Sequence, residues 1–395
     1  MKKINVLFFE SGEGFGGSAK SLFIFLKNLN PEIFTPTVLV IHKGPFIKEI
    51  ENLGVELYKL DYFDVNAISL YRVARYVFGN KHIITNNIRY YVSLIANNLF
   101  NLRKVIGIIN RNKINVVHLN NGIGENLVAL LAAKLLKKPI VAHVRGTEPL
   151  LSFEKFLCKW ISFYFMQNRT LMELWGKSVP KNRIVKIVNY IDFGLIPSVN
   201  PRKVKEELGI PWDVPTIGFV GRLIEGKGVE IFLKGAARVV KQKRDARFVV
   251  VGSGPLEKSL KRMGSNLGLS HDVIFTGWRS DVFDMISCFD VLIQATTTFP
   301  ESFGNTIIEA MALNKPVIAS KVSGPDEIVL HGETGFLVEP GNVEQLAEKM
   351  CVILDDKKLA EELGKNGRIL AENKYDVKKE MFLYEDIYRK LVLGN

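Results

Sequence analysis

The feature that most constrains the fold is a repeated order of short apolar runs, glycine-containing loops and helical patterns. Six runs in the first half are predicted to be strands: 4–9, 37–41, 55–58, 116–119, 140–143 and 183–188. Six more follow in the second half: 216–220, 248–251, 273–275, 291–295, 316–320 and 336–338. Strands that alternate with helices form parallel sheets covered on both faces. The sequence therefore predicts a doubly wound α/β protein.

The chain of 395 residues is long enough for two domains. Pro197, Asn200 and Pro201 indicate a linker. We expect one domain over 1–195 and a second over 196–376. Residues 377–393 read as a final helix.

The net charge of +12 is unevenly distributed. Residues 1–195 contain 26 Lys/Arg and 13 Asp/Glu, whereas the remainder contains 27 and 28. A basic half suits nucleic acid, an anionic membrane surface or an anionic substrate. Without a helix-turn-helix, zinc-finger or RNA-binding signature, nucleic acid is the least favoured of these partners.

The cysteines and the hydrophobic runs indicate a cytoplasmic protein. Cys158, Cys288 and Cys351 are widely spaced and predict neither a disulfide framework nor a metal site. The apolar run 4–9 is too short for a signal peptide and reads as a strand. No run of 18 apolar residues predicts a membrane-spanning helix.

Two carboxylates, Glu301 and Glu309, bracket a glycine turn and the start of a predicted helix. A helix start offers unpaired N–H groups that suit a phosphate, and Gly304 allows close approach to the backbone. The carboxylates would accept hydrogen bonds from sugar hydroxyls. The candidate ligand-binding residues in this stretch are Glu301, Ser302, Phe303, Gly304, Asn305, Thr306 and Glu309.

Two cations, Arg222 and Lys227, lie in one loop that begins at Gly221 between a strand and a helix. Fixed cations beside helix starts form a strong diphosphate site. The chain has no Asp-x-Asp, a pattern that holds a metal cation on a diphosphate in other proteins, so these two cations and the helix starts would have to neutralise the diphosphate themselves. Further candidates follow the next strands: Gly252, Gly254, Gly277 and Trp278. The alternatives are simple turns for the glycines and core packing for the tryptophan.

These loops resemble the Gly-Arg-Leu-x-x-x-Lys-Gly and Glu-x-Phe-Gly-x-x-x-x-Glu motifs of retaining GT-B glycosyltransferases of family 4. The resemblance covers nearly the entire second half. It implies a GT-B architecture of two Rossmann-like domains that face each other across a cleft, with helix 377–395 crossing back to the first domain. It assigns Arg222 and Lys227 to the nucleotide diphosphate, Glu309 to the ribose and Glu301 to the donor sugar. The glycines and Trp278 would flank the base.

Gly12, Gly14 and Gly17 satisfy G-x-G-x-x-G between a strand and a helix. An NAD site would require an acid after the second strand, where His42 and Lys43 stand instead. We favour a loop whose Gly16 and Gly17 lie against a donor phosphate or the acceptor, similar to the family's N-terminal Gly-Gly loop. The alternative is a tight strand-to-helix turn.

Polar residues follow two further strands of the first half. Because ligands of parallel sheets bind beyond the carboxyl ends of strands, these residues are candidates for acceptor binding. They are His118, Asn120, Asn121, Arg145 and Glu148. His143 resembles the family histidine that reaches the donor sugar. It completes a predicted catalytic set with Glu301, Arg222 and Lys227.

Two segments suggest peripheral membrane contact. One is an uncharged stretch over 90–102. The other is an apolar face of a predicted helix with lysines beside it, which suits a bilayer interface or a protein core equally. Its members are Phe153, Phe156, Leu157, Trp160, Ile161 and Tyr164.

The leading hypothesis is a metal-independent, retaining hexosyltransferase that needs no cofactor. Its partners would be a UDP- or GDP-sugar donor and a glycan or lipid-linked acceptor in cell-surface polysaccharide assembly. Three alternatives remain: an NAD-dependent Rossmann oxidoreductase, a non-catalytic sugar-nucleotide-binding protein, and an epimerase of the same fold.

Overall fold

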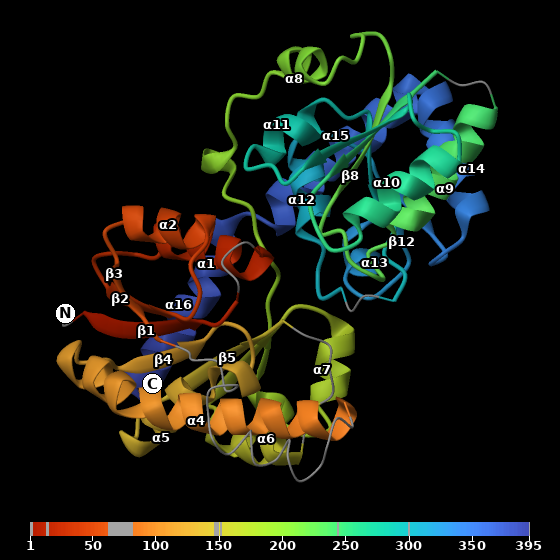
Figure 1. The fold of residues 1–395 in the computed structure, drawn as a ribbon. Coiled ribbons are helices and arrows are strands. Elements are labelled where there is room, and N and C mark those ends of the chain that lie inside the picture. Colours follow the sequence, from red (N-terminus) through yellow and green to blue (C-terminus); the bar gives the residue numbers. More distant parts are fainter. Residues whose placement is uncertain are drawn as a thin grey trace. The chain divides into compact units, whose positions relative to one another are not determined.

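The computed structural model describes residues 3–12, 16–61, 82–145, 150, 152–242, 245–298 and 301–394. The chain forms two compact units (Figure 1). The N-terminal unit contains Met1–Met166, Met172–Lys186 and Met381–Asn395. The C-terminal unit contains Gln167–Leu171 and Ile187–Glu380. The chain therefore passes between the units more than once.

The N-terminal unit is built on a seven-stranded parallel sheet of order β3-β2-β1-β4-β5-β6-β7. Its strands are β1 (Ile4–Glu10), β2 (Phe34–Val40), β3 (Glu56–Lys59), β4 (Val116–Leu119), β5 (Ile140–Val144), β6 (Phe163–Met166) and β7 (Ile184–Lys186). The helices along this part of the chain are α1 (Gly17–Asn28), α2 (Pro45–Asn52), α4 (His82–Arg111), η2 (Gly124–Asn126), α5 (Leu127–Leu135), α6 (Ser152–Leu157), η3 (Cys158–Trp160), α7 (Arg169–Trp175) and η4 (Lys181–Arg183).

The last helix, α16 (Val377–Leu393), completes the core of the N-terminal unit although it ends the chain. Its Tyr384 and Tyr388 are fully buried. The Tyr384 ring lies 5.0 Å from that of Phe25 on α1, and Phe25 lies 5.4 Å from Phe8 on β1. Aromatic side chains bury large apolar areas and pack edge to face at such distances. The final helix is therefore an integral part of this unit.

The C-terminal unit has a six-stranded parallel sheet of order β10-β9-β8-β11-β12-β13. Its strands are β8 (Thr216–Val220), β9 (Arg247–Val251), β10 (Val273–Gly277), β11 (Val291–Gln294), β12 (Val317–Ser320) and β13 (Gly335–Val338). Its helices are η5 (Phe193–Leu195), α8 (Pro201–Glu207), α9 (Val229–Lys241), α10 (Glu257–Asn266), α11 (Val282–Ser287), α12 (Asn305–Ala312), α13 (Pro325–Ile328), α14 (Val343–Asp355) and α15 (Lys357–Lys374).

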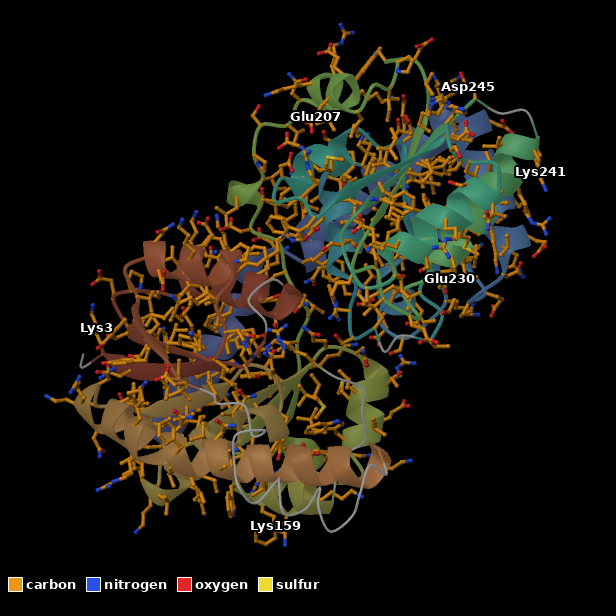
Figure 2. The ribbon with its side chains drawn as sticks, in the orientation of Figure 1. Lys3, Lys159, Glu207, Glu230, Lys241 and Asp245 are labelled. Carbon is orange, nitrogen blue, oxygen red and sulfur yellow. The ribbon has the colours of Figure 1, made fainter. Side chains whose placement is uncertain are left out.

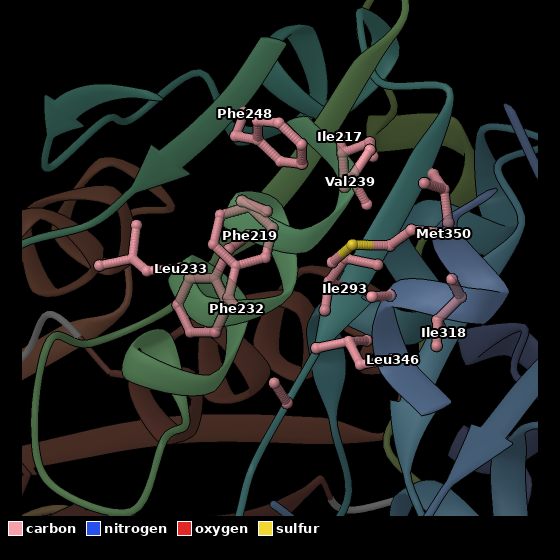
Figure 3. Close-up of a cluster of buried hydrophobic side chains, with 14 of the residues drawn as sticks. Ile217, Phe219, Phe232, Leu233, Val239, Phe248, Ile293, Ile318, Leu346 and Met350 are labelled. Carbon is pink, nitrogen blue, oxygen red and sulfur yellow. The ribbon is translucent and has the colours of Figure 1, made fainter. Parts of the chain in front are cut away.

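Alternating side chains of these strands feed two hydrophobic cores, one on each face of the sheet. Ile217 and Phe219 of β8 pack on the face that Figure 3 shows, together with Phe232 of α9. Val249 of β9 belongs to the core on the opposite face. A period of two is expected when both faces of a strand are buried. The two cores together hold the strand ends, and the loops that follow them, in fixed places.

The predicted α/β architecture with two parallel sheets is confirmed. The predicted helical face over 153–164 is confirmed only as far as Trp160, the end of η3. Beyond it Phe163–Met166 form β6, and Tyr164 is fully buried there. A helical period places Tyr164 on that face, whereas strand pairing with β5 and β7 decides the conformation of 163–166. The division of the two units differs from the sequence estimate, since they separate between Lys186 and Ile187 and again between Glu380 and Met381.

Candidate functional site

Each sheet contains one point where the strand order reverses. In the N-terminal unit this point lies between β1 and β4, and in the C-terminal unit it lies between β8 and β11. Loops on either side of such a point run in opposite directions and leave a crevice at the carboxyl ends of the strands. Both crevices contain polar residues that the sequence analysis singled out.

The crevice of the C-terminal unit contains an ion pair between Lys227 and Glu301. Lys227 lies in the loop between β8 and α9, and Glu301 lies between β11 and α12. The Lys227 Nζ lies 2.5 Å from the Glu301 Oε2, and the side chains are 15% and 14% exposed. A pair this short joins the two loops across the point of strand reversal. Two of the four predicted catalytic residues are therefore in direct contact.

Gln294, the last residue of β11, supports the same carboxylate. Its Nε2 donates to the Glu301 Oε2 at 3.2 Å and to the Thr296 Oγ1 at 3.0 Å. Gln294 is buried, with 6% of its surface exposed. Sequence reasoning missed it, although a polar residue that ends an apolar strand before a candidate loop was a usable signal. Gln294 helps to fix the direction in which Glu301 points.

Glycines allow the loops of this crevice to pack backbone against backbone. Gly228 has φ +80°, and a Cβ there would lie 1.7 Å from the Ala295 carbonyl oxygen. At Gly252, with φ +138°, a Cβ would lie 1.9 Å from the Gly221 carbonyl oxygen. Only glycine tolerates both the positive φ and the close approach. These glycines therefore hold three loops together, in addition to any contact with a ligand.

Helix α12 begins beside this ion pair and fits an anion. Gly304 precedes it with φ +115°, and among the described residues no side chain caps the helix and no acid occupies its first turn. The first N–H groups of a helix lack intrahelical partners and attract negative charge. Glu309, on the second turn of α12, is 5% exposed. The predicted arrangement of two acids around a helix start is present.

Other predicted donor-binding residues differ in their exposure. Phe303 is buried, and its ring packs edge to face against that of Tyr375 with centroids 5.7 Å apart. The Phe303 ring is thus part of the core. Trp278 is 46% exposed and can present its ring to a planar base. Arg222 is exposed on the loop that contains Lys227. Of the other predicted residues of this unit, Gly254 and Ser302 lie on these loops. Thr306 lies in the first turn of α12, and Gly277 is the last residue of β10.

The crevice of the N-terminal unit is organised by a buried acid, Glu10, at the end of β1. Its Oε1 accepts from the Asn121 Nδ2 at 2.6 Å and from the Gly12 backbone N–H at 2.8 Å. Its Oε2 accepts from the Asn120 Nδ2. Sequence reasoning placed both asparagines at the acceptor side but gave no role to Glu10. The signal was an acid that ends an apolar strand before a glycine-rich loop.

Arg145 connects this acid cluster with His143. Its Nε and Nη2 donate to the backbone and side-chain oxygens of Asn120 at 2.9 and 3.2 Å. Its Nη2 also lies 3.1 Å from the His143 Nδ1. Because a guanidinium only donates, the His143 Nδ1 accepts and the Nε2 bears the proton. That buried N–H has no hydrogen-bond partner among the described residues.

His118 lies next to His143 and is equally buried. Its Nδ1 is 2.6 Å from the Tyr388 Oη of α16. Burial, with a smaller effect of the Arg145 charge, lowers the pKa of His118 to about 3. Burial also lowers the pKa of His143 well below its ordinary value, with smaller effects of Arg145 and His118. Both rings are therefore neutral near neutral pH and suit hydrogen bonding rather than charge pairing.

The structure thus collects the predicted residues into two groups, one in each unit. Gly16 precedes α1 and Gly17 begins it, both exposed, and a Cβ at Gly16 would meet no atom within 4 Å. Close packing of neighbouring atoms therefore does not explain why position 16 is a glycine. His143 is 2% exposed, so a ligand would have to displace the atoms that cover its Nε2. Glu148 and Gly14 lie outside the described residues.

Comparison with known proteins agrees with the fold of two α/β units. The chain aligns over 97% of its length with the crystal structure of Anabaena Alr3699/HepE in complex with UDP and glucose, with a TM-score of 0.79, 21% identity and 99% of that chain covered. At this identity the similarity establishes the fold. The protein therefore has the GT-B fold.

Residues 201–370 match the family Glycosyl transferases group 1. The N-acetyl-alpha-D-glucosaminyl L-malate synthase of Bacillus anthracis is 25% identical over 72% of this chain and 77% of its own. The UDP-Gal:alpha-D-GlcNAc-diphosphoundecaprenol alpha-1,3-galactosyltransferase of Escherichia coli is 25% identical over 77% and 82%. Two further bacterial glycosyltransferases are 31% and 34% identical over 49% and 42% of their own length. The matched domain and the fold together support a glycosyltransferase.

Proposed function

We propose that the protein is a retaining glycosyltransferase that moves a hexose from a UDP- or GDP-sugar to an acceptor hydroxyl. The observation that supports this most directly is the Lys227–Glu301 pair beside the start of α12. An ammonium, helix N–H groups and a carboxylate in one crevice provide for a diphosphate and a sugar at the same time. UDP in the related Alr3699/HepE structure supports a uridine donor.

The proposed reaction breaks the bond between the anomeric carbon and the diphosphate oxygen and forms a bond from the acceptor oxygen to the same face of that carbon. The acceptor proton passes to the departing phosphate oxygen. Lys227, Arg222 and the N–H groups of α12 stabilise the charge that develops on the leaving group. No metal is required in this scheme, because fixed protein cations supply that stabilisation. Glu301 orients the donor sugar, and Glu309 holds the ribose.

The N-terminal unit is assigned to acceptor binding. Asn121 and Arg145 are polar groups at the carboxyl edge of its sheet, where a hydroxylated ligand can be bound. The neutral His143 supplies an N–H for a sugar hydroxyl. An undecaprenyl-diphosphate sugar, as named for the E. coli relative, is the acceptor class that we propose.

The function is tested with the full chain and a panel of UDP-glucose, UDP-galactose, UDP-N-acetylglucosamine and GDP-mannose. A true donor should raise the melting temperature by mass action. NMR of the first-formed product or hydrolysed sugar should show the α anomer, and EDTA should leave the rate unchanged. Failure of every donor to shift the melting temperature would reject a sugar-nucleotide site. A β product would reject retention, and loss of activity in EDTA would reject metal independence.

We further propose that the N-terminal unit contacts an anionic membrane through a basic aromatic patch formed by Lys134, Phe156, Lys159 and Trp160. The Lys134 Nζ lies 5.6 Å from the Trp160 ring, and the Lys159 Nζ lies 5.5 Å from the Phe156 ring. Phe156 is 57% exposed, and Figure 2 shows Lys159 at the edge of this unit. Trp160 is half-buried. An exposed aromatic ring beside lysines suits the interface of a bilayer with anionic lipids.

A hollow of about 370 Å³ adjoins this patch, and none of the described residues that line it is acidic. They are Lys134, Lys137, Lys138, Pro139, Trp160, Ser162 and Leu391. Pro139 and Ser162 directly precede β5 and β6, so the hollow lies at the amino edge of the sheet. The acceptor residues lie at its carboxyl edge. The patch would therefore anchor the protein rather than bind the acceptor sugar. None of the described helices combines the length and the hydropathy that a membrane span requires.

Charge reversal at this patch should release the protein from anionic vesicles. We expect the wild type to float with vesicles of phosphatidylcholine and phosphatidylglycerol. The K134E/K159E variant should bind these vesicles at least tenfold more weakly, because each lysine contributes about 1 kcal/mol. The variant K241E/K258E changes the charge equally in the C-terminal unit and should bind like the wild type. The assignment would be contradicted if both variants bound the vesicles as strongly as the wild type, or if binding persisted with pure phosphatidylcholine.

A further inference from the structure

Two segments contact the candidate donor-binding loop. Both lie near points where the chain passes from one unit to the other. Residues 167–171 follow β6 but belong to the C-terminal unit, and residues 187–189 open the main part of that unit. Within the unit, Asn168 and Asn189 reach the loop that contains Glu301 and the start of α12. The predicted ligand-binding residues include neither asparagine.

Asn168 is fully buried and makes two different hydrogen bonds. Its Oδ1 accepts from the Leu171 N–H at 2.8 Å, the bond of an ordinary cap for α7. Its Nδ2 donates to the Ser302 carbonyl oxygen at 2.7 Å. Ser and Asp cap helices as well as Asn does, but only Asn also supplies an amide donor at this position. The second bond fixes the backbone directly after Glu301.

Asn189 acts on the other end of the same loop. Its Nδ2 donates to the Asn305 Oδ1 at 2.7 Å, and its Oδ1 accepts from the Gln167 Nε2. Asn305 is the first residue of α12. The bond turns the Asn305 amide oxygen toward Asn189 and its NH₂ group away from it. The NH₂ group is the half of that amide that can donate to a phosphate.

We infer that Asn168 and Asn189 are positioning residues for the donor-binding loop. Asn168 holds the Ser302 carbonyl, which sets the place of Glu301, and Asn189 sets the orientation of the Asn305 amide at the helix start. The ligand that benefits is a nucleoside diphosphate sugar, so this inference rests on the proposed function. A purely structural role would lower stability without a specific loss of nucleotide binding.

The test compares Asn168→Ser with Asn342→Ser in the full chain. Asn342 caps α14 through the Gln345 N–H at 3.0 Å and lies on another loop. Each variant keeps a hydroxyl that can cap, and only Asn168→Ser removes the bond to Ser302. We expect UDP to bind roughly tenfold more weakly to Asn168→Ser, as for the loss of one hydrogen bond. UDP should bind to Asn342→Ser as it does to the wild type.

A second variant and a ligand-free measurement complete the test. Asn189→Asp keeps the shape but places a carboxylate against the Asn305 oxygen, so the Asn305 amide should turn and UDP should bind at least tenfold more weakly. In the absence of nucleotide, amide hydrogen exchange over 301–307 should be faster in Asn168→Ser than in Asn342→Ser. Unchanged exchange there, or wild-type UDP affinity in both loop variants, would overturn the inference. If the wild type binds no nucleotide, the proposed function fails. The amide hydrogen exchange over 301–307 still decides the positioning role in that case.

Discussion

Replacing Lys227 with methionine should reduce sugar transfer roughly hundredfold and also lower stability, in line with the loss of one charged stabilising group. The substitution keeps the apolar stem and removes the ammonium that lies 2.5 Å from the Glu301 carboxylate. Because both side chains are mostly buried, the carboxylate left behind should cost roughly 3 kcal/mol of unfolding free energy. Initial rates measure the loss of transfer, with whichever sugar nucleotide of the panel raises the melting temperature. Urea unfolding measures the loss of stability separately.

A matched ion pair on the surface provides the control. Lys261 lies 2.7 Å from Glu257, with side chains 51% and 30% exposed. Lys261→Met should change the unfolding free energy by only about 0.5 kcal/mol, because water screens an exposed pair. Adding Glu301→Gln to Lys227→Met should restore much of the stability without restoring transfer. Equal losses at Lys227 and Lys261, or full activity of Lys227→Met, would show that the pair has no special role.

Replacing Gly228 with alanine should destabilise the C-terminal unit severely, by more than about 4 kcal/mol. The new Cβ would lie 1.7 Å from the Ala295 carbonyl oxygen, so the loop and the end of β11 would have to separate. This movement would displace the neighbouring Lys227. Thermal unfolding followed by circular dichroism measures the loss.

Gly268 separates backbone strain from this steric conflict. Its φ is +79°, compared with +80° at Gly228, yet a Cβ at Gly268 would meet no atom within 4 Å. Gly268→Ala should therefore cost only the 1–2 kcal/mol or so of a left-handed alanine. If the two variants lose the same stability, close packing against Ala295 is not the reason for glycine at 228.

The sequence predicted local structure well where hydrophobic period and punctuation agree. The runs 216–220 and 291–295, each followed by a polar or glycine-containing loop, are β8 and β11 in the structure. It failed at 163–166, a strand that it did not predict, because the helical spacing places Tyr164 on one face with Phe156 and Trp160. Strand pairing at both edges of that run supplies hydrogen bonds that a local pattern does not reveal.

The partners of the residues that support the site were also hidden from the sequence. Gln294 and Glu10 each end a strand, and their partners are set by which strands are neighbours in the sheet. Asn168 has the sequence position of an ordinary helix cap, and only the fold shows that its amide also reaches Ser302. Chemistry suggested the candidates for ligand contact. A polar residue at a strand end was the signal for Gln294 and Glu10, but it did not reveal which side chains they hold.

By itself, the sequence determined the α/β class, most of the strands, and the loops that contain Arg222, Lys227 and Glu301. Periodicity, glycine and charge within short windows are sufficient for that, because they act on neighbouring residues. Only the tertiary structure decided that Lys227 pairs with Glu301, 74 residues away, and that Asn168 supports Ser302, 134 residues away. The physical reason is the strand order, which places β11 beside β8 and so brings two distant loops to one crevice.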